Sequence, residues 1–138
     1  MSNSAAQVVQ TLLTKPTDLQ HVKNLTTPDI TYVSLSENNP QLKRYLPWAG
    51  INKGPESIVR TFEGIGRTWE TKAFEVREVI EQGGTVAMFG SFTYRGHESG
   101  KEITSPFSLL AHVKEGKISY IQFLEDTFGT SGTVSPKD

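Results

Sequence analysis

Apolar residues recur at helical spacing in three segments of the first half of the chain. Capping residues and prolines mark the ends of these segments, because they satisfy or interrupt the backbone hydrogen bonds of a helix. Ser2 or Ser4 can cap the first segment. The predicted helices cover residues 4–15, lie between Asp18 and Pro28, and extend from Pro55 to Trp69.

Apolar and polar residues alternate in other segments, which is the period-two pattern of β-strands. Residues 29–35 form the first such segment. After Trp69 four consecutive segments alternate, and turns at residues 83–84 and 115–116 join them in antiparallel pairs. This order predicts an α+β fold in which three N-terminal helices pack on one face of a strongly curved, mostly antiparallel sheet and leave a cone-shaped space.

The chain has 138 residues, of which 36% are hydrophobic and 21% are charged. These values are typical of one globular domain, which we place at residues 1–128. Residues 129–138 contain no apolar segment and are expected to form a loose tail. Fourteen basic and fifteen acidic residues, spread along the chain, give a net charge of −1 and argue against binding to nucleic acid or an anionic membrane.

The chain has no cysteine, which excludes disulfides, iron–sulfur clusters and thiol catalysis. His21, His97 and His112 lack the spacing of paired metal ligands, so we predict no metal site. No apolar segment approaches the roughly 20 residues of a membrane helix, and the first residues lack the pattern of a secretory leader. We therefore expect a cytoplasmic protein.

Residues 36–53 contain turn formers that interrupt any period, together with Tyr45 and Trp48. A loop with two aromatic side chains is expected to fold over another part of the molecule, such as the mouth of a pocket. Trp48 combines an apolar ring with a polar N–H group, which suits a flat or hydrophobic ligand as well as plain core packing.

Three motifs occur in a characteristic order along the chain. They are Pro47-Trp48-Ala49-Gly50 followed by Lys53-Gly54-Pro55-Glu56, the turn Glu115-Gly116-Lys117-Ile118, and the ending Phe123-Leu124-Glu125-Asp126-Thr127. Over about residues 5–128 the chain resembles the nuclear-transport-factor-2-like (NTF2-like) superfamily, in its SnoaL-like branch of polyketide-cyclase-like and ketosteroid-isomerase-like proteins. The resemblance implies a homodimer with a cavity between helices and sheet. It does not give the function, because this fold hosts several kinds of enzyme and non-catalytic subunits.

The resemblance allows a comparison with the catalytic residues of ketosteroid isomerases. These enzymes use a general-base aspartate after the first strand, a tyrosine on the first helix and a protonated aspartate on the penultimate strand. The corresponding positions here hold Ser34, Gln10 and Leu110. None of these side chains can take over the acid–base roles.

Limonene epoxide hydrolase offers a second comparison. Its tyrosine and asparagine on the first strand hold water, while an arginine and two aspartates supply acid–base chemistry. Here Tyr32 matches the tyrosine and Ser34 replaces the asparagine. Gly90, Phe92 and Phe123 stand at the arginine and aspartate positions, so this acid–base set is also missing.

The two-residue turn at residues 115–116 sets the expected register of the last hairpin. The expected pairs are Val113 with Ile118, His112 with Ser119, Leu110 with Ile121, Ser108 with Phe123, and Pro106 with Glu125. A bulge near Pro106 would reverse the outer half. The resemblance places the cavity side of the last strand at Ile121, Phe123 and Glu125. The expected pocket residues are Tyr32, Ser34, Trp48, Phe92, Ser108, Leu110, His112, Ile121, Phe123 and Glu125.

Three pocket residues are candidates for catalysis. A Glu125 carboxylate in an apolar cavity has a raised pKa and can act as acid or base near neutral pH, whereas at the rim it is solvated or paired with Lys43 or Arg44. His112 is either a proton shuttle or a sheet histidine bonded to its neighbour. Tyr32 is the hydrogen-bond donor.

Two functions fit these residues. One is a cofactor-independent isomerase, dehydratase or cyclase that binds a small hydrophobic molecule and transfers protons, and the other is a non-catalytic ligand-binding or assembly module. A cavity of several hundred cubic ångströms with a buried carboxylate favours the enzyme, whereas a cavity filled by Phe92, Phe107 and Trp69 favours the module. Either protein is expected to be a homodimer formed through the sheet. Asp126 is expected to accept backbone amides where the last strand ends.

Overall fold

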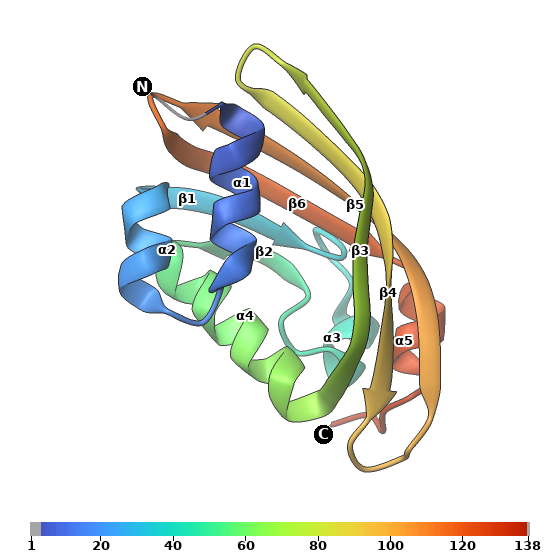
Figure 1. The fold of residues 1–138 in the computed structure, drawn as a ribbon. Coiled ribbons are helices and arrows are strands. Elements are labelled where there is room, and N and C mark those ends of the chain that lie inside the picture. The colour runs from blue at the N-terminus through green and yellow to red at the C-terminus, as the bar shows by residue number, and fades with distance from the viewer. Residues whose placement is uncertain (1–3, 138) are drawn as a thin grey trace.

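The structure is a computed structural model that describes residues 4–137 and contains, within them, five helices and six strands (Figure 1). In chain order the elements are α1 (Ala5–Thr14), α2 (Leu19–Leu25), β1 (Thr26–Ser34), α3 (Pro40–Tyr45), β2 (Gly50–Lys53), α4 (Pro55–Thr68), β3 (Trp69–Gln82), β4 (Thr85–Gly96), β5 (Glu102–Lys114), β6 (Lys117–Glu125) and α5 (Thr127–Ser131). Every helix and strand predicted from periodicity is present. The two helices α3 and α5 and the short strand β2 are additional.

Capping residues mark the helix ends. Ser4 accepts a hydrogen bond from the backbone N–H of Gln7, whose side chain accepts one from the backbone N–H of Ser4, so that α1 begins with a capping box. Ser2, the alternative cap, lies outside the described residues. Asn39 caps α3 and Asp126 caps α5. Because these two helices have only six and five residues, they show no helical period in the sequence.

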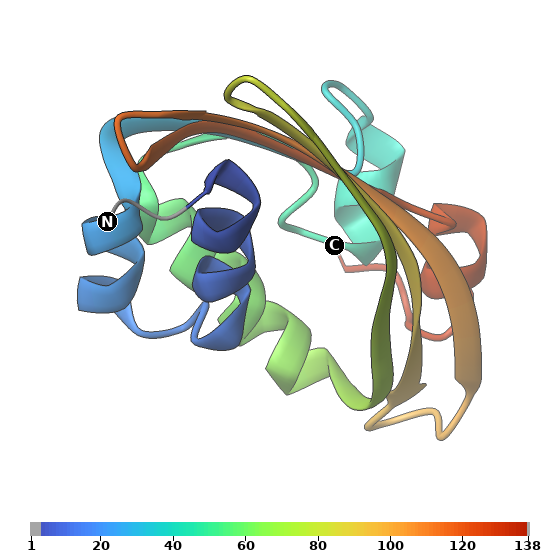
Figure 2. The same cartoon turned by 45° about the horizontal axis from the view of Figure 1, so that its top comes forward.

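The six strands form one sheet in the order β2-β1-β6-β5-β4-β3. The neighbours β1 and β6 are parallel, and all other neighbouring strands are antiparallel. Figure 2 shows that α1 and α4 lie on the same side of the sheet. We call this side the inner face and the opposite side the outer face. The core lies between the inner face and these helices.

The register of the last hairpin differs from the expected one. The turn and the pair Val113 with Ile118 are as predicted, but His112 pairs with Tyr120. Ser119 is therefore an extra residue in β6, a β-bulge that shifts every later pair by one position. As a result Glu125 lies opposite Phe107. The bulge lies beside the turn, not near Pro106.

This shift reverses the face on which alternate β5 residues lie, because side chains alternate across a strand. Phe107, Leu109 and Ala111 lie on the inner face and are 4%, 3% and 0% exposed. The predicted pocket residues on the same strand point the other way. The placement of Ser108, Leu110 and His112 in the pocket was therefore wrong, and they lie on the outer face.

The C-terminal segment also differs from the loose tail expected for residues 129–138. The described part of this segment packs against the fold, with Thr130 of α5 and Thr133 just beyond it buried. Thr133 accepts a hydrogen bond from Trp69 Nε1 at 2.7 Å, and its carbonyl accepts one from Ser99 Oγ at 2.8 Å. Polar side chains hold this segment in place, so apolar patterning could not reveal it.

Candidate active site

A carboxylate lies beside an aromatic surface on the inner face. Glu125 pairs with Phe107 at the end of β6, and the two side chains therefore point to the same side. The ring of Phe107 stacks on Phe123 with centroids 5.3 Å apart, and Phe92 packs on Tyr94 at 4.2 Å. An ionised carboxylate in such surroundings loses hydration that the rings cannot replace.

The pKa of the Glu125 carboxyl is raised to about 7. Burial is the main cause, the nearby side chain of Thr130 lowers the pKa, and the charge of Asp126 raises it. A carboxyl group with this pKa exists in both protonation states near neutral pH. It can therefore accept or donate a proton there.

Two tyrosines lie within electrostatic range of this carboxylate. Burial is the main cause that raises the pKa of Tyr32 to about 12. The charge of Glu125 adds to this rise, whereas the hydroxyl groups of Ser34 and Thr61 lower the pKa in part. Burial also raises the pKa of Tyr94 above its ordinary value, and the charges of Glu125 and Tyr32 add to the effect. Both phenols stay protonated at neutral pH, so they can donate hydrogen bonds.

The pKa of Glu125 predicts a pH dependence of stability. Because its value of about 7 in the folded chain exceeds the ordinary 4.5, the folded state binds this proton more tightly than the unfolded state. The stabilisation is complete below pH 4.5 and is lost as the pH rises through about 7. Allowing for partial exposure, we expect a loss of about 2 kcal/mol in the free energy of unfolding.

Urea denaturation at a series of pH values measures this loss. The Glu125→Gln variant has no carboxyl group to titrate, so its free energy of unfolding should fall less over the same pH range. Asp126→Asn is the matched control, because it removes the neighbouring carboxylate and keeps Glu125. Identical pH dependence in the wild type and in Glu125→Gln would contradict the assigned pKa.

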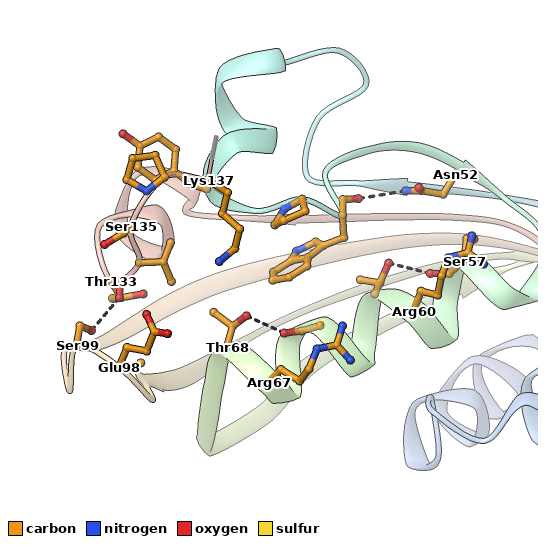
Figure 3. A pocket seen from close by; sticks show the side chains of 18 residues that line it. Asn52, Ser57, Arg60, Arg67, Thr68, Glu98, Ser99, Thr133, Ser135 and Lys137 are labelled. Atoms are coloured by element: carbon orange, nitrogen blue, oxygen red, sulfur yellow. Dashed lines mark hydrogen bonds between the residues drawn. The ribbon is translucent and has the colours of Figure 1, made fainter.

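A pocket of about 660 Å³ lies between α4 and the C-terminal segment (Figure 3). Trp48, which precedes β2, is one of its lining residues. Thr61 lines it from α4, and its hydroxyl donates a hydrogen bond to the Ser57 carbonyl at 2.8 Å. The same hydroxyl lies beside Tyr32. The pocket therefore reaches the surroundings of the Tyr32 phenol.

Comparison with known protein families assigns the chain to one of them. Residues 9–121 match the model of the SnoaL-like domain. The chain belongs to the SnoaL-like family. This family assignment agrees with the resemblance found in the sequence motifs.

Two curated relatives of this SnoaL-like protein come from fungi. Patulin synthesis protein F of Aspergillus clavatus is 37% identical over 135 residues, which cover 95% of this chain and 68% of the relative. Patulin biosynthesis cluster protein F of Penicillium expansum is 34% identical over 119 residues, which cover 84% of this chain and 60% of the relative. The chain thus spans about two thirds of the length of these relatives.

Solved structures establish the fold of the SnoaL-like chain. An NTF2-like protein from Burkholderia xenovorans LB400 superposes with a TM-score of 0.81 at 18% identity and covers 98% of each chain. TerC, co-crystallised with polyporic acid, gives a TM-score of 0.73 at 18% identity and covers 94% of this chain and 96% of TerC. The protein therefore has an NTF2-like α+β fold with a six-stranded, mostly antiparallel sheet.

A second cavity lies between the inner face and the helices of the SnoaL-like fold. Its volume is about 20 Å³, which is room for about one water molecule. Three predicted pocket residues, Tyr32, Ile121 and Phe123, line it. The buried ring of Phe92 lies against Phe123, one of the lining residues, with ring centroids 6.4 Å apart.

The remaining predicted residues of the inner face lie outside both cavities. Ser34 and Phe92 are 1% exposed and do not line either cavity. Glu125 is half-buried and lines neither cavity, although it acts electrostatically on Tyr32 and Tyr94. Glu125 therefore lies within electrostatic range of Tyr32 but outside the two cavities.

His112 lies on the outer face, where it is a sheet histidine in contact with its neighbours. Its Nδ1 lies 3.4 Å from Thr85 Oγ1, and its ring packs on Tyr120 at 5.3 Å. Asp126 Oδ1 accepts a hydrogen bond from the Gly129 backbone N–H at 3.0 Å, which is the capping role expected for it. Neither side chain belongs to the candidate active site.

Sequence reasoning missed several residues of the larger pocket. Arg60 and Arg67 are seven residues apart on α4 and therefore share one side of the helix. This spacing was available in the sequence as a signal. Lys137 and Thr133 come from the segment that was expected to be loose.

Among residues 4–137 no group of three or more histidine, aspartate or glutamate side chains is arranged to hold a metal ion. The salt bridges among these residues join Lys23 to Glu56, Lys72 to Glu70, and Arg77 to Glu75. The alternative pairing of Glu125 with Lys43 or Arg44 is thus not formed.

None of the helices in residues 4–137 is long and apolar enough to cross a membrane.

Proposed function

We propose that this SnoaL-like protein is a cofactor-independent enzyme that isomerises, dehydrates or cyclises a small hydrophobic molecule by proton transfer. The observation that carries the proposal is the position of Glu125 on the inner face, next to an aromatic surface and near two protonated phenols. A proton-transfer enzyme needs a base with a pKa near the working pH and a donor for the oxygen that becomes negative. These residues offer both.

Each residue has a separate role in the proposed reaction. The Glu125 carboxylate removes a proton from carbon or oxygen of the substrate and returns it at a second position. Tyr32 donates a hydrogen bond to the enolate or alkoxide oxygen that forms, and Tyr94 is placed to assist. We assign no catalytic role to His112, the other base considered from the sequence, because it lies on the outer face.

The relatives support a role in the synthesis of a small metabolite. Two of them are named for patulin synthesis, and the structurally similar TerC was crystallised with polyporic acid. The larger pocket gives such a molecule a route toward Tyr32, since Thr61 touches both. The test is turnover by the wild type and by a Glu125→Gln variant of a small molecule identified by mass spectrometry of the purified protein.

A non-catalytic ligand-binding module is the second candidate. The inner cavity of about 20 Å³ favours it, because Trp69, Phe92 and Phe107 are buried where a substrate cavity was expected. The pocket of about 660 Å³ and the carboxyl group of Glu125 favour the enzyme. Full turnover by Glu125→Gln would leave the binding module as the better account.

We also propose that the protein is a homodimer formed through the outer face. Phe89 of β4 and Leu124 of β6 are 46% and 39% exposed on either side of β5, which gives this face an apolar centre. We expect Phe89→Lys to convert a dimer into a monomer, as measured by light scattering at working concentration. Phe128→Lys is the control, because Phe128 is 91% exposed and lies in α5, outside the sheet. A monomeric wild type would contradict the proposal.

A further inference from the structure

The larger pocket carries an excess of positive charge. Arg60 and Arg67 line it from α4, and Lys137 lines it from the C-terminal segment. Glu98 is the single acidic side chain among its described lining residues. The chain as a whole has a net charge of −1, so the excess of cations is a local property of this pocket.

The two arginines have no carboxylate partner within the described part of the chain. The salt bridges among residues 4–137 involve neither Arg60 nor Arg67. An arginine guanidinium binds a carboxylate or a similar anion through two parallel hydrogen bonds, which a neutral group cannot match. Figure 3 shows both arginines on α4 and Lys137 extending toward this helix from the opposite side.

The pocket also presents a fixed aromatic side chain. The ring of Trp48 packs edge-to-face on Trp69, with centroids 5.6 Å apart and an angle of 71° between the planes. It lies against α4 at Gly64, where a Cβ atom would come within 2.9 Å of the indole. The indole is thus held in place before any ligand binds. Such a ring is suited to stacking with a planar molecule.

We propose that this pocket binds a planar aromatic acid, with its anionic group held by the arginines of α4 and its ring against Trp48. The volume of about 660 Å³ fits a ligand of this class, because small-molecule sites usually measure about 300 to 1,000 Å³. The inference deepens the proposed function by naming the class of substrate. This inference rests on the proposed function in one respect, because it takes the bound acid to be the substrate of the proposed enzyme.

Salicylate and its uncharged amide, salicylamide, form a matched pair of probes, because they share the ring and the hydroxyl group and differ in charge. Titration followed by protein NMR measures the dissociation constant of each. We expect salicylate to bind the wild type about five- to tenfold more tightly than salicylamide, with the difference shrinking at high salt. The shifted resonances should include the indole N–H of Trp48.

Variants of the two arginines test whether the preference for the charged probe arises in this pocket. We expect Arg60→Gln with Arg67→Gln to weaken salicylate binding about tenfold and to leave salicylamide binding unchanged. Arg77→Gln is the matched control, because Arg77 lies on β3, does not line the pocket and pairs with Glu75. The control should bind both probes as the wild type does.

Several results would overturn the inference. They are the absence of salicylate binding, equal affinity for the two probes, and unchanged salicylate binding by the double arginine variant. These results are separate from a failure of the proposed function, because binding is measured without turnover. If salicylate binding depends on the arginines while Glu125→Gln keeps full activity, the acid-binding pocket stands and the proposed catalytic role of Glu125 fails.

Discussion

Replacing Glu125 by glutamine should lower kcat/KM by about 10²- to 10⁴-fold, the usual contribution of a positioned general base. Glutamine keeps the size and polarity of the side chain but cannot accept a proton in this pH range. The loss should appear in kcat, because the base acts in the transition state more than in the bound ground state. Measurement of kcat and KM with an identified substrate tests this result.

The pH profile gives a sharper form of the same prediction. If Glu125 acts as the base, wild-type activity is carried by its carboxylate and should fall as the pH drops through about 7. The residual activity of Glu125→Gln should lack this transition. A proton-donating role would invert the profile, with activity falling above about 7. A wild-type rate that does not change across this pH range would exclude both roles.

Two matched variants control for indirect effects. Asp126→Asn removes the adjacent carboxylate, so it should keep the wild-type shape of the profile while lowering the pKa of Glu125 slightly. His112→Ala lies on the outer face and should retain wild-type kcat/KM. A large loss of activity in His112→Ala would contradict the register given by the β-bulge at Ser119.

Replacing Trp69 by alanine should lower the free energy of unfolding by about 3 to 5 kcal/mol, as for other large buried aromatic residues. Trp69 is 2% exposed, stacks on Tyr94 at 4.9 Å and touches Trp48 edge-on. Its Nε1–H also holds the C-terminal segment through Thr133. The substitution therefore leaves a cavity and releases a polar partner at the same time. Urea denaturation measures the loss.

Two further variants separate these contributions. Thr133→Val keeps the shape of the side chain but removes the acceptor, so it should cost about 1 to 3 kcal/mol and make residues 129–137 easier to cleave by protease. Phe128→Ala should change stability by less than about 0.5 kcal/mol, because this ring is 91% exposed. Wild-type stability in Thr133→Val would restore the earlier interpretation of a loose tail.

The volume of the inner cavity bears on how a substrate reaches Tyr32. At about 20 Å³ the cavity cannot hold a substrate, so binding there requires movement of the side chains around it. The pocket of about 660 Å³ is already formed on the other side of Thr61. We therefore expect the substrate of the proposed enzyme to bind first in the larger pocket, with the reacting oxygen directed toward Tyr32.

Local sequence signals determined most of the backbone. The helical spacing in α1, α2 and α4 and the alternation in β3 to β6 arise from each element covering one apolar face, so they can be identified without knowledge of the rest of the fold. The turn at Glu115 and Gly116 was equally clear, and both residues have positive φ angles, of 54° and 76°. The family motifs and the candidate residues Glu125 and Tyr32 also came from the sequence.

Only the tertiary structure decided which side chains share a site. The bulge at Ser119 moved His112 out of the site and brought Phe107 in. Periodicity did not locate the bulge, because β6 has apolar residues in both phases of the alternation, Ile118 and Tyr120 in one and Ile121 and Phe123 in the other. Thr133 is buried and accepts hydrogen bonds from Trp69 and Ser99, which are distant in the sequence, so periodicity cannot detect its position. The cationic pocket was missed for the same reason, since Arg60 and Arg67 of α4 and Lys137 of the C-terminal segment line one pocket only in the folded chain.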